Sequence, residues 1–213
     1  MLMEGLEKGK SFLVVGSGGS IKQYRSHILS LVNKINPVVI GVNAMTDLCC
    51  PHYHLWTNRK QFLTLGNCIS NESELIVGPS IDEKMVRQFY KGRYFRLETD
   101  KISKISRYQN RVNGDFRTAG SLAIVVADLM GASEILVAGM DGYTLHPRKD
   151  VESGKEDQHC YGKGHTDDAD WEDCLKKDEE VYENLISIKE SGIEFSIITP
   201  TKFQKFYDGN QLL

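Results

Sequence analysis

The chain has 213 residues, of which 40% are hydrophobic and 26% are charged, and this composition excludes a disordered protein. The formal net charge of −3 combines two opposite stretches. Lys84 to Arg117 holds ten bases and three acids, a net of +7, whereas Asp150 to Glu180 holds twelve acids and four lysines, a net of −8. This balance, without a basic motif interleaved with aromatic residues, argues against a nucleic-acid-binding domain.

Residues 12–42 predict a strand, turn, helix and strand in succession. The apolar run Phe12–Val15 predicts a strand and leads into the turn Gly16-Ser-Gly-Gly-Ser20. A helix is expected from Ile21 to Ile35, because its apolar residues recur at spacings of three and four. Pro37 ends this helix, and Val38–Val42 predicts a second buried strand.

The rest of the chain continues the alternation of strands and helices. Further strands are expected at His52–Trp56, Glu74–Val77, Arg93–Leu97, Glu134–Ala138 and Ile193–Ile198. Helices are expected at Asp82–Tyr90, at Thr118–Met130, from Asp167 or Asp168 to Gly192, and in a short tail after Pro200. The polar segment 144–166 has no periodicity, and we expect it to be a long lid loop, since loops of this length are usually functional or mobile.

These elements predict an α/β fold, a doubly wound, mostly parallel, Rossmann-like sheet of about six or seven strands, in one domain covering residues 1–213. In such sheets, ligands bind beyond the carboxyl ends of the strands. The residues at those ends are Gly16–Ser20, Asn43, Thr57 and Asn58, Gly78 and Pro79, and Gly139–Tyr143.

The Gly-rich turn has two interpretations. Its backbone N–H groups could cradle a phosphate at a helix N-terminus, or the turn could be a tight connection without a ligand. A dinucleotide fingerprint is disfavoured, because it requires glycine where Ile21 stands and an acid near Asn43. A Walker P-loop is excluded, because no Gly-Lys-Ser or Gly-Lys-Thr follows.

Three segments together resemble the bacterial sialyltransferases that use CMP-sialic acid. They are Gly16–Ser20 with Val42-Asn43, Thr118–Ser121 with Gly131–Tyr143, and Tyr161-Gly-Lys-Gly-His165 before a long helix. The same core is similar to flagellar nonulosonate-transfer proteins and to archaeal hydroxymethyl-dihydropterin pyrophosphokinases. The resemblance therefore implies a nucleotide-binding transferase of surface polysaccharide biosynthesis.

The resemblance also implies roles for individual residues. His165 would be the general base on an acceptor hydroxyl, and Tyr143 would donate to the departing phosphate. The chain departs from the sialyltransferase pattern at Gly19, where that pattern has proline, and no obvious second tyrosine follows Tyr143. The residues implied to bind nucleotide or substrate are Ser17, Gly18, Ser20, Asn43, Asn58, Thr118, Gly120, Ser121 and Asp141.

The chemistry that these residues predict is transfer from a nucleotide-sugar donor to a carbohydrate acceptor without a metal or another cofactor. Histidine titrates near neutral pH and suits a general base, with His159 as the competitor of His165. The +7 stretch is expected to form a basic wall for the nucleotide, facing the acidic lid. A homo-oligomer is expected for transferases of this kind.

Two alternatives remain open. A pyrophosphokinase would need Mg²⁺, and carboxylates such as Asp167, Asp168 and Asp170 near His159 and His165 are compatible with metal binding. A non-catalytic partner module of a polysaccharide pathway is the third reading. We expect a cytoplasmic protein, because neither a membrane-spanning run of roughly 20 apolar residues nor a signal peptide is present. The five cysteines, without a CxxC pair, predict neither a disulfide framework nor a zinc knuckle.

Overall fold

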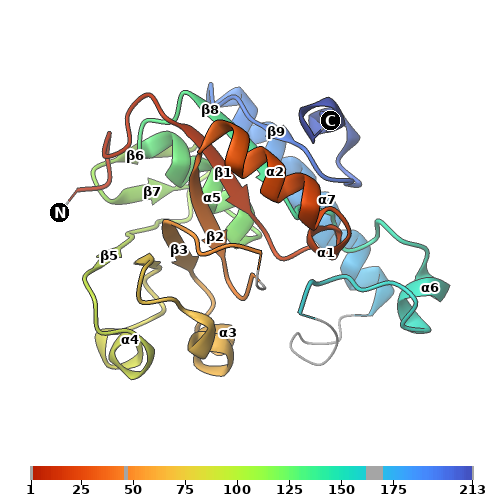
Figure 1. The fold of residues 1–213 in the computed structure, drawn as a ribbon, viewed down its shortest axis with the longest axis horizontal. Helices are drawn as coiled ribbons and strands as arrows, with labels where there is room; N and C mark the ends of the chain where they lie inside the picture. Colours follow the sequence, from red (N-terminus) through yellow and green to blue (C-terminus); the bar gives the residue numbers. More distant parts are fainter. Residues whose placement is uncertain (1, 46–47, 162–169, 213) are drawn as a thin grey trace.

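The structure, a computed structural model, describes residues 2–45, 48–161 and 170–212 (Figure 1). The strands are β1 (Ser11–Val15), β2 (Val38–Val42), β3 (Tyr53–Trp56), β4 (Glu74–Val77), β5 (Tyr94–Arg96), β6 (Ser106–Tyr108), β7 (Arg111–Asn113), β8 (Glu134–Ala138) and β9 (Ser196–Ile197). The helices are α1 (Ser20–Gln23), α2 (Arg25–Ile35), α3 (Arg59–Leu65), α4 (Glu83–Phe89), α5 (Ala119–Leu129), α6 (Arg148–Glu152) and α7 (Trp171–Glu190). Short 3₁₀ helices cover Gly66–Cys68, Gln204–Phe206 and Gly209–Leu212.

Seven strands form one parallel sheet in the order β5-β4-β3-β2-β1-β8-β9. The chain winds outward from β1 to β5 and then returns to the other side of β1 with β8 and β9. This arrangement confirms the predicted doubly wound, Rossmann-like fold. The winding direction reverses between β1 and β8, and the crevice at such a switch point is the usual ligand site.

Alternate residues of the sheet pack on opposite layers of helices. Phe12 and Val14 of β1 belong to the core shared with α5 and α7, whereas Leu13 and Val15 pack with α1 and α2. Figure 1 shows α2 in front of the sheet and α5 and α7 behind it. Helix α5 is buried over nearly its whole length, which explains why its sequence is apolar on all sides.

The structure differs from the predicted elements in four places. The predicted helix from Ile21 to Ile35 is broken at Tyr24, whose φ of −99° and ψ of 14° lie outside the helical range. The segment 144–161 of the expected lid loop contains α6 and packs on the domain, so it is not an irregular loop. The antiparallel pair β6–β7 lies within the basic stretch and was not predicted. The tail forms 3₁₀ turns in place of a helix.

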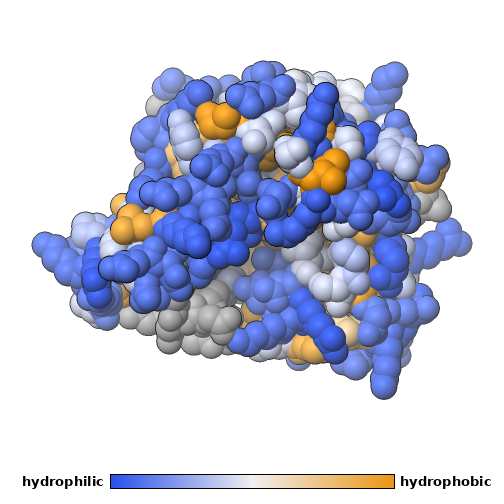
Figure 2. Space-filling view, turned by 180° about the vertical axis from the view of Figure 1, so that it is seen from behind, coloured by the Kyte–Doolittle hydropathy of each residue, from blue (hydrophilic) through white to orange (hydrophobic). Residues whose placement is uncertain are grey.

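The surface in Figure 2 is mostly hydrophilic, with small separate spots of hydrophobic residues. Within the three described ranges, no helix has both the length and the apolarity needed to span a membrane.

Candidate functional site

A cavity of about 850 Å³ opens at the carboxyl edge of the sheet, over the switch point between β1 and β8. Its floor comes from the turns that follow these strands, and the N-terminal end of α5 forms one wall. A segment comprising residues 157–161, here called the strap, covers the Gly-rich turn: the Cys160 N–H donates to the Ser17 carbonyl at 2.8 Å, and Gly18 pairs with His159. The cavity is large enough to hold a ligand of the size of a nucleotide.

Asp141 fills the position at the Gly-rich turn where a phosphate was predicted. Its carboxylate accepts from the Ser20 N–H at 2.7 Å and from the Ser20 hydroxyl at 2.5 Å. The side chain is 5% exposed, and this burial raises the pKa of its carboxyl, while the two bonds from Ser20 oppose the rise. The positive end of α1 is therefore already occupied by a carboxylate of the same chain.

Two other N–H groups of the turn, those of Gly16 and Gly18, are also engaged. The Gly16 N–H donates to the Ala138 carbonyl at 2.8 Å, and the Gly18 N–H donates to the Gly139 carbonyl at 2.9 Å. A Cβ on Gly18 would lie 2.4 Å from the carboxyl carbon of Asp141. The N–H groups of Gly16, Gly18 and Ser20 therefore bond within the protein, and Gly18 leaves room for Asp141, so phosphate binding at this turn stays a prediction.

The N-terminus of α5 presents a second, open place for an anion. Thr118 caps the helix by accepting from the Ser121 N–H at 3.2 Å, and Thr118 and Gly120 line the cavity. The first N–H groups of a helix have no partner within it, and the helix dipole favours negative charge there. Arg117 precedes the helix, lines the cavity and pairs with Glu180 of α7 at 2.7 Å.

Asn43 contributes an amide from the end of β2. Its φ of 52° is left-handed, and its carbonyl lies 2.6 Å from Nε2 of His54 on the neighbouring strand. Burial lowers the pKa of His54 to about 4, so its imidazole is neutral and donates this bond. Oδ1 of Asn43 is buried without a hydrogen-bond partner, although the residue lines the cavity. Such an acceptor is expected to meet an N–H or O–H group of a ligand.

Three aromatic rings gather on the strap side of the cavity. His159 stacks on Tyr161, with ring centroids 5.0 Å apart, and meets the ring of Tyr143 edge-on at 5.8 Å. Burial lowers the pKa of His159, raises that of Tyr143 and raises that of Tyr161 to about 12. A neutral imidazole and two protonated phenols therefore stand together near pH 7. Tyr161 thus belongs to the same aromatic cluster as Tyr143, with His159 between them.

The predicted site residues divide into three groups. His165 lies outside the described residues. Ser20 and Ser121 are buried beside the cavity, where they bond to Asp141 and to Thr118, and they do not line it. Asn58 caps α3 by accepting from the Gln61 N–H at 3.1 Å, and it lines the cavity. The cavity is also lined by the predicted residues Ser17, Gly18, Asn43, Thr118, Gly120, Asp141 and Tyr143.

The charges around the cavity differ from the expected layout. Of the basic stretch Lys84 to Arg117, only Arg117 is among the lining residues in the described part of the chain, so the expected basic wall is wrong. The other lining cations come from the distant segments α3, α6 and α7. Acidic residues of the described parts of the 150–170 segment also line the cavity. The charged lining residues are Lys60, Arg117, Asp141, Arg148, Glu152, Glu156, Asp157, Asp170 and Lys177.

Within the described residues, no group of three or more His, Cys, Asp or Glu side chains is arranged to hold a metal ion. His165, Asp167 and Asp168 of the candidate metal cluster lie outside those residues. No protein-family model matches the chain, and no curated protein matches its sequence. The resemblance to CMP-dependent sialyltransferases therefore stays a prediction from the residues that carry it.

Proposed function

We propose that the protein is a nucleotide-sugar-dependent glycosyltransferase of surface polysaccharide biosynthesis, with a CMP-nonulosonate as its donor. One observation carries the proposal: the cavity at the switch point joins an open helix N-terminus to a buried cluster of two tyrosines and a neutral histidine. The helix end suits the phosphate of a donor, and the cluster suits proton transfer at the sugar.

The phosphate of the donor would lie at the N-terminus of α5 beside Arg117, and not in the Gly-rich turn. There the N–H groups of Ala119 and Gly120 and the guanidinium of Arg117 can stabilise the charge that grows on the leaving phosphate. Oδ1 of Asn43 would accept a hydrogen bond from a base amino group or a ribose hydroxyl. This placement gives a partner to Oδ1 of Asn43, which has none within the protein, and avoids Asp141.

The reaction needs no metal in this proposal. The acceptor hydroxyl oxygen forms a bond to the anomeric carbon while the bond from that carbon to the phosphate oxygen breaks. The hydroxyl proton passes to a histidine, either His159 or the predicted His165, and the nucleotide leaves with the bonding electrons. Tyr143 can donate its hydroxyl proton in a hydrogen bond to the leaving phosphate. A positioned general base contributes about 10²- to 10⁴-fold to the rate.

The test begins with calorimetric titration of CMP, UDP, GDP and ATP, followed by turnover of CMP-activated sugars. We expect CMP to bind and the donor to be consumed without added metal. His159→Asn and His165→Asn separate the two candidate bases, since only the variant lacking the base loses turnover by about 100-fold or more. Absence of binding by any nucleotide at millimolar concentration would favour the non-catalytic partner module.

A Mg²⁺-dependent pyrophosphokinase is the second candidate, and the acidic lining favours it. Glu152, Glu156, Asp157 and Asp170 line the cavity, and carboxylates with substrate phosphates are the usual ligands of Mg²⁺. Release of AMP from ATP in the presence of Mg²⁺ and a hydroxymethyl pterin would establish this activity. Donor turnover that is unaffected by a chelator would dismiss it.

A further inference from the structure

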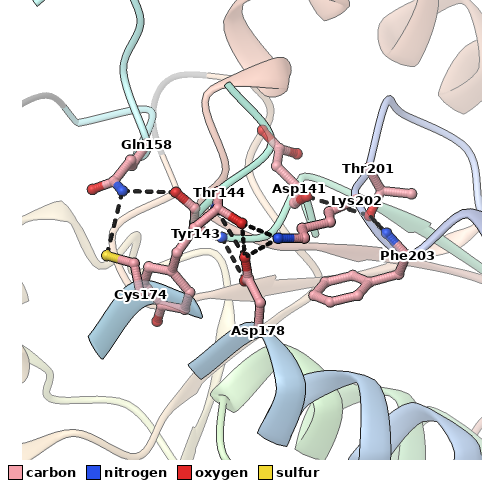
Figure 3. A network of polar contacts seen from close by, with 9 residues as sticks. All are labelled: Asp141, Tyr143, Thr144, Gln158, Cys174, Asp178, Thr201, Lys202 and Phe203. Carbon is pink, nitrogen blue, oxygen red and sulfur yellow. Dashed lines mark hydrogen bonds and ion pairs between the residues drawn. The ribbon is translucent and has the colours of Figure 1, made fainter. Parts of the chain in front are cut away.

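Asp178 is a buried carboxylate that the mechanism above does not use. It lies on α7, is 3% exposed, and points at the turn that follows β8 (Figure 3). Its Oδ1 accepts from the Tyr143 N–H at 2.7 Å, and its Oδ2 accepts from the Thr144 N–H at 2.9 Å and from the Thr144 hydroxyl at 2.7 Å. Nζ of Lys202 lies 3.7 Å from Oδ2. A charged acceptor inside the protein thus has three donors and a cation around it.

The turn itself is shaped for this carboxylate. Gly142 has a φ of +88°, and a Cβ on it would lie 3.2 Å from Oδ1 of Asp178. A side chain at that position would therefore be strained and would press on the carboxylate. Glycine at position 142 therefore lets the turn approach α7 without strain.

The strap holds the same peptide from the other side. Nε2 of Gln158 donates to the Tyr143 carbonyl at 2.7 Å and lies 3.6 Å from the Cys174 sulfur (Figure 3). Nζ of Lys177, the neighbour of Asp178 on α7, lies 5.4 Å from the centre of the Tyr143 ring. Tyr143 is therefore fixed at its N–H, at its carbonyl and at its ring.

We propose that Asp178 is a positioning residue that sets the place of the Tyr143 phenol in the cavity. Asp178 is not among the residues that line the cavity, and it acts through the backbone of residues 143 and 144. An asparagine side chain has one oxygen that accepts and one NH₂ group that donates. In Asp178→Asn the NH₂ group would therefore face at least one of the three N–H or O–H donors, and that hydrogen bond would be lost. The turn would then lose its fixed geometry while the shape of the side chain is kept. The catalytic consequence rests on the proposed function, but the positioning does not.

The first experiment reads the position of Tyr143 without any assumption about activity. Tyrosines labelled with carbon-13 at Cζ are observed by NMR, and Tyr143→Phe identifies the signal of Tyr143. In Asp178→Asn we expect this signal to shift or broaden, and the amides of residues 143 and 144 to exchange their hydrogens at least about tenfold faster. Glu179→Gln is the matched control, because Glu179 is the exposed next residue of the same helix. Unchanged signals and exchange rates in Asp178→Asn would overturn the proposal.

The second experiment measures donor turnover. Asp178→Asn should lower kcat by about 10- to 100-fold with KM within about twofold of the original value, because a small displacement of a catalytic group affects the reacting state most. In the Tyr143→Phe background the same substitution should have little further effect. An equal loss of kcat in both backgrounds would show that Asp178 does not act through Tyr143.

The two experiments fail in different ways. Absence of turnover in the unmodified protein rejects the proposed glycosyl transfer, and the NMR experiment then judges Asp178 alone. If Asp178→Asn does not fold, Thr144→Val removes one of the three donors and keeps the carboxylate. The proposal then requires faster amide exchange at Tyr143 in Thr144→Val than in Glu179→Gln.

Discussion

Gly18 leaves room for the Asp141 carboxylate at the entrance of α1, because it has no side chain. The carboxyl carbon of Asp141 would lie 2.4 Å from a Cβ at this position, and its bonds to Ser20 prevent Asp141 from moving away freely. We expect Gly18→Ala to destabilise the protein by about 1–3 kcal/mol, the usual cost of forcing an extra group into a packed site. Urea unfolding measures the loss. Gly78→Ala is the control, because its nearest neighbour would be 3.3 Å away; an equal loss in both variants would contradict the explanation.

His54 makes stability depend on pH in the acid range. Burial lowers its pKa in the folded state to about 4 from 6.5, so the unfolded chain binds a proton before the folded protein does. The contribution of neutral His54 is fully present above about pH 6.5 and is lost as the pH falls toward 4, by on the order of 3 kcal/mol. The free energy of unfolding of the unmodified protein, measured with urea, should therefore fall as the pH is lowered over this range.

The control for this prediction is His54→Phe. The variant loses the bond to the Asn43 carbonyl and is less stable at neutral pH, but it cannot bind the proton. We expect a smaller loss of stability on acidification than in the unmodified protein. Parallel pH profiles for the two proteins would show that His54 is not the titrating group. His159 also has a lowered pKa and is present in both proteins. Only the difference between the two pH profiles therefore reports the titration of His54.

At the scale of elements, Thr118 caps α5 and also lines the cavity, so one substitution tests both stability and the proposed phosphate site. Thr118→Val removes the acceptor of the Ser121 N–H and should cost about 1 kcal/mol of stability. It should also weaken CMP binding, because the first turn of α5 forms the proposed phosphate site. Asp82→Ala is the matched control: Asp82 caps α4 by accepting from the Met85 N–H at 2.9 Å and does not line the cavity. Equal effects of both variants on CMP binding, measured by calorimetry, would argue against the site.

The elements that the sequence predicted are those whose pattern is local. The strands of the large sheet read as short apolar runs because their buried residues face helices on both sides, as for Val38–Val42. The β6–β7 pair was missed because Ser106–Tyr108 is largely exposed and has no apolar pattern. Helix α6 was missed for a similar reason, since none of its residues is buried. The break at Tyr24 leaves the apolar spacing intact, so periodicity could not reveal it.

At the scale of the whole molecule, the sequence predicted the site residues that lie at the ends of strands. It did not predict the contacts between segments that are far apart in the chain. Parallel strands end at one edge, so Asn43 and Tyr143 could be placed together from the sequence. The bonds between Ser20 and Asp141 join residues 121 positions apart, and no local pattern indicates that a carboxylate fills the turn. Asp178 and Gln158 were missed likewise, because their role depends on how α7 and the strap pack on the turn after β8.

The positions of the basic residues give a last prediction, which concerns the binding of an anionic ligand. Apart from Arg117, the basic stretch does not line the cavity: Arg107 pairs with Asp128, and Arg111 pairs with Glu98 and Asp100. Under the proposed function, attraction of the nucleotide would depend on a few cations from separate segments, of which Arg117 lies beside the N-terminus of α5. We expect Arg117→Gln to weaken CMP binding about tenfold at about 0.05 M salt and by less at about 0.5 M salt, because salt screens an exposed charge.

Calorimetry at the two salt concentrations measures this effect, and Arg111→Gln is the control that removes the same charge away from the cavity. The Arg117–Glu180 pair is half-exposed on both sides, so its loss should change stability little. A weakening of CMP binding in Arg117→Gln therefore reports the local charge and not unfolding. If both arginine variants weaken binding equally, the net charge of the molecule attracts the ligand, and α5 is not the phosphate site.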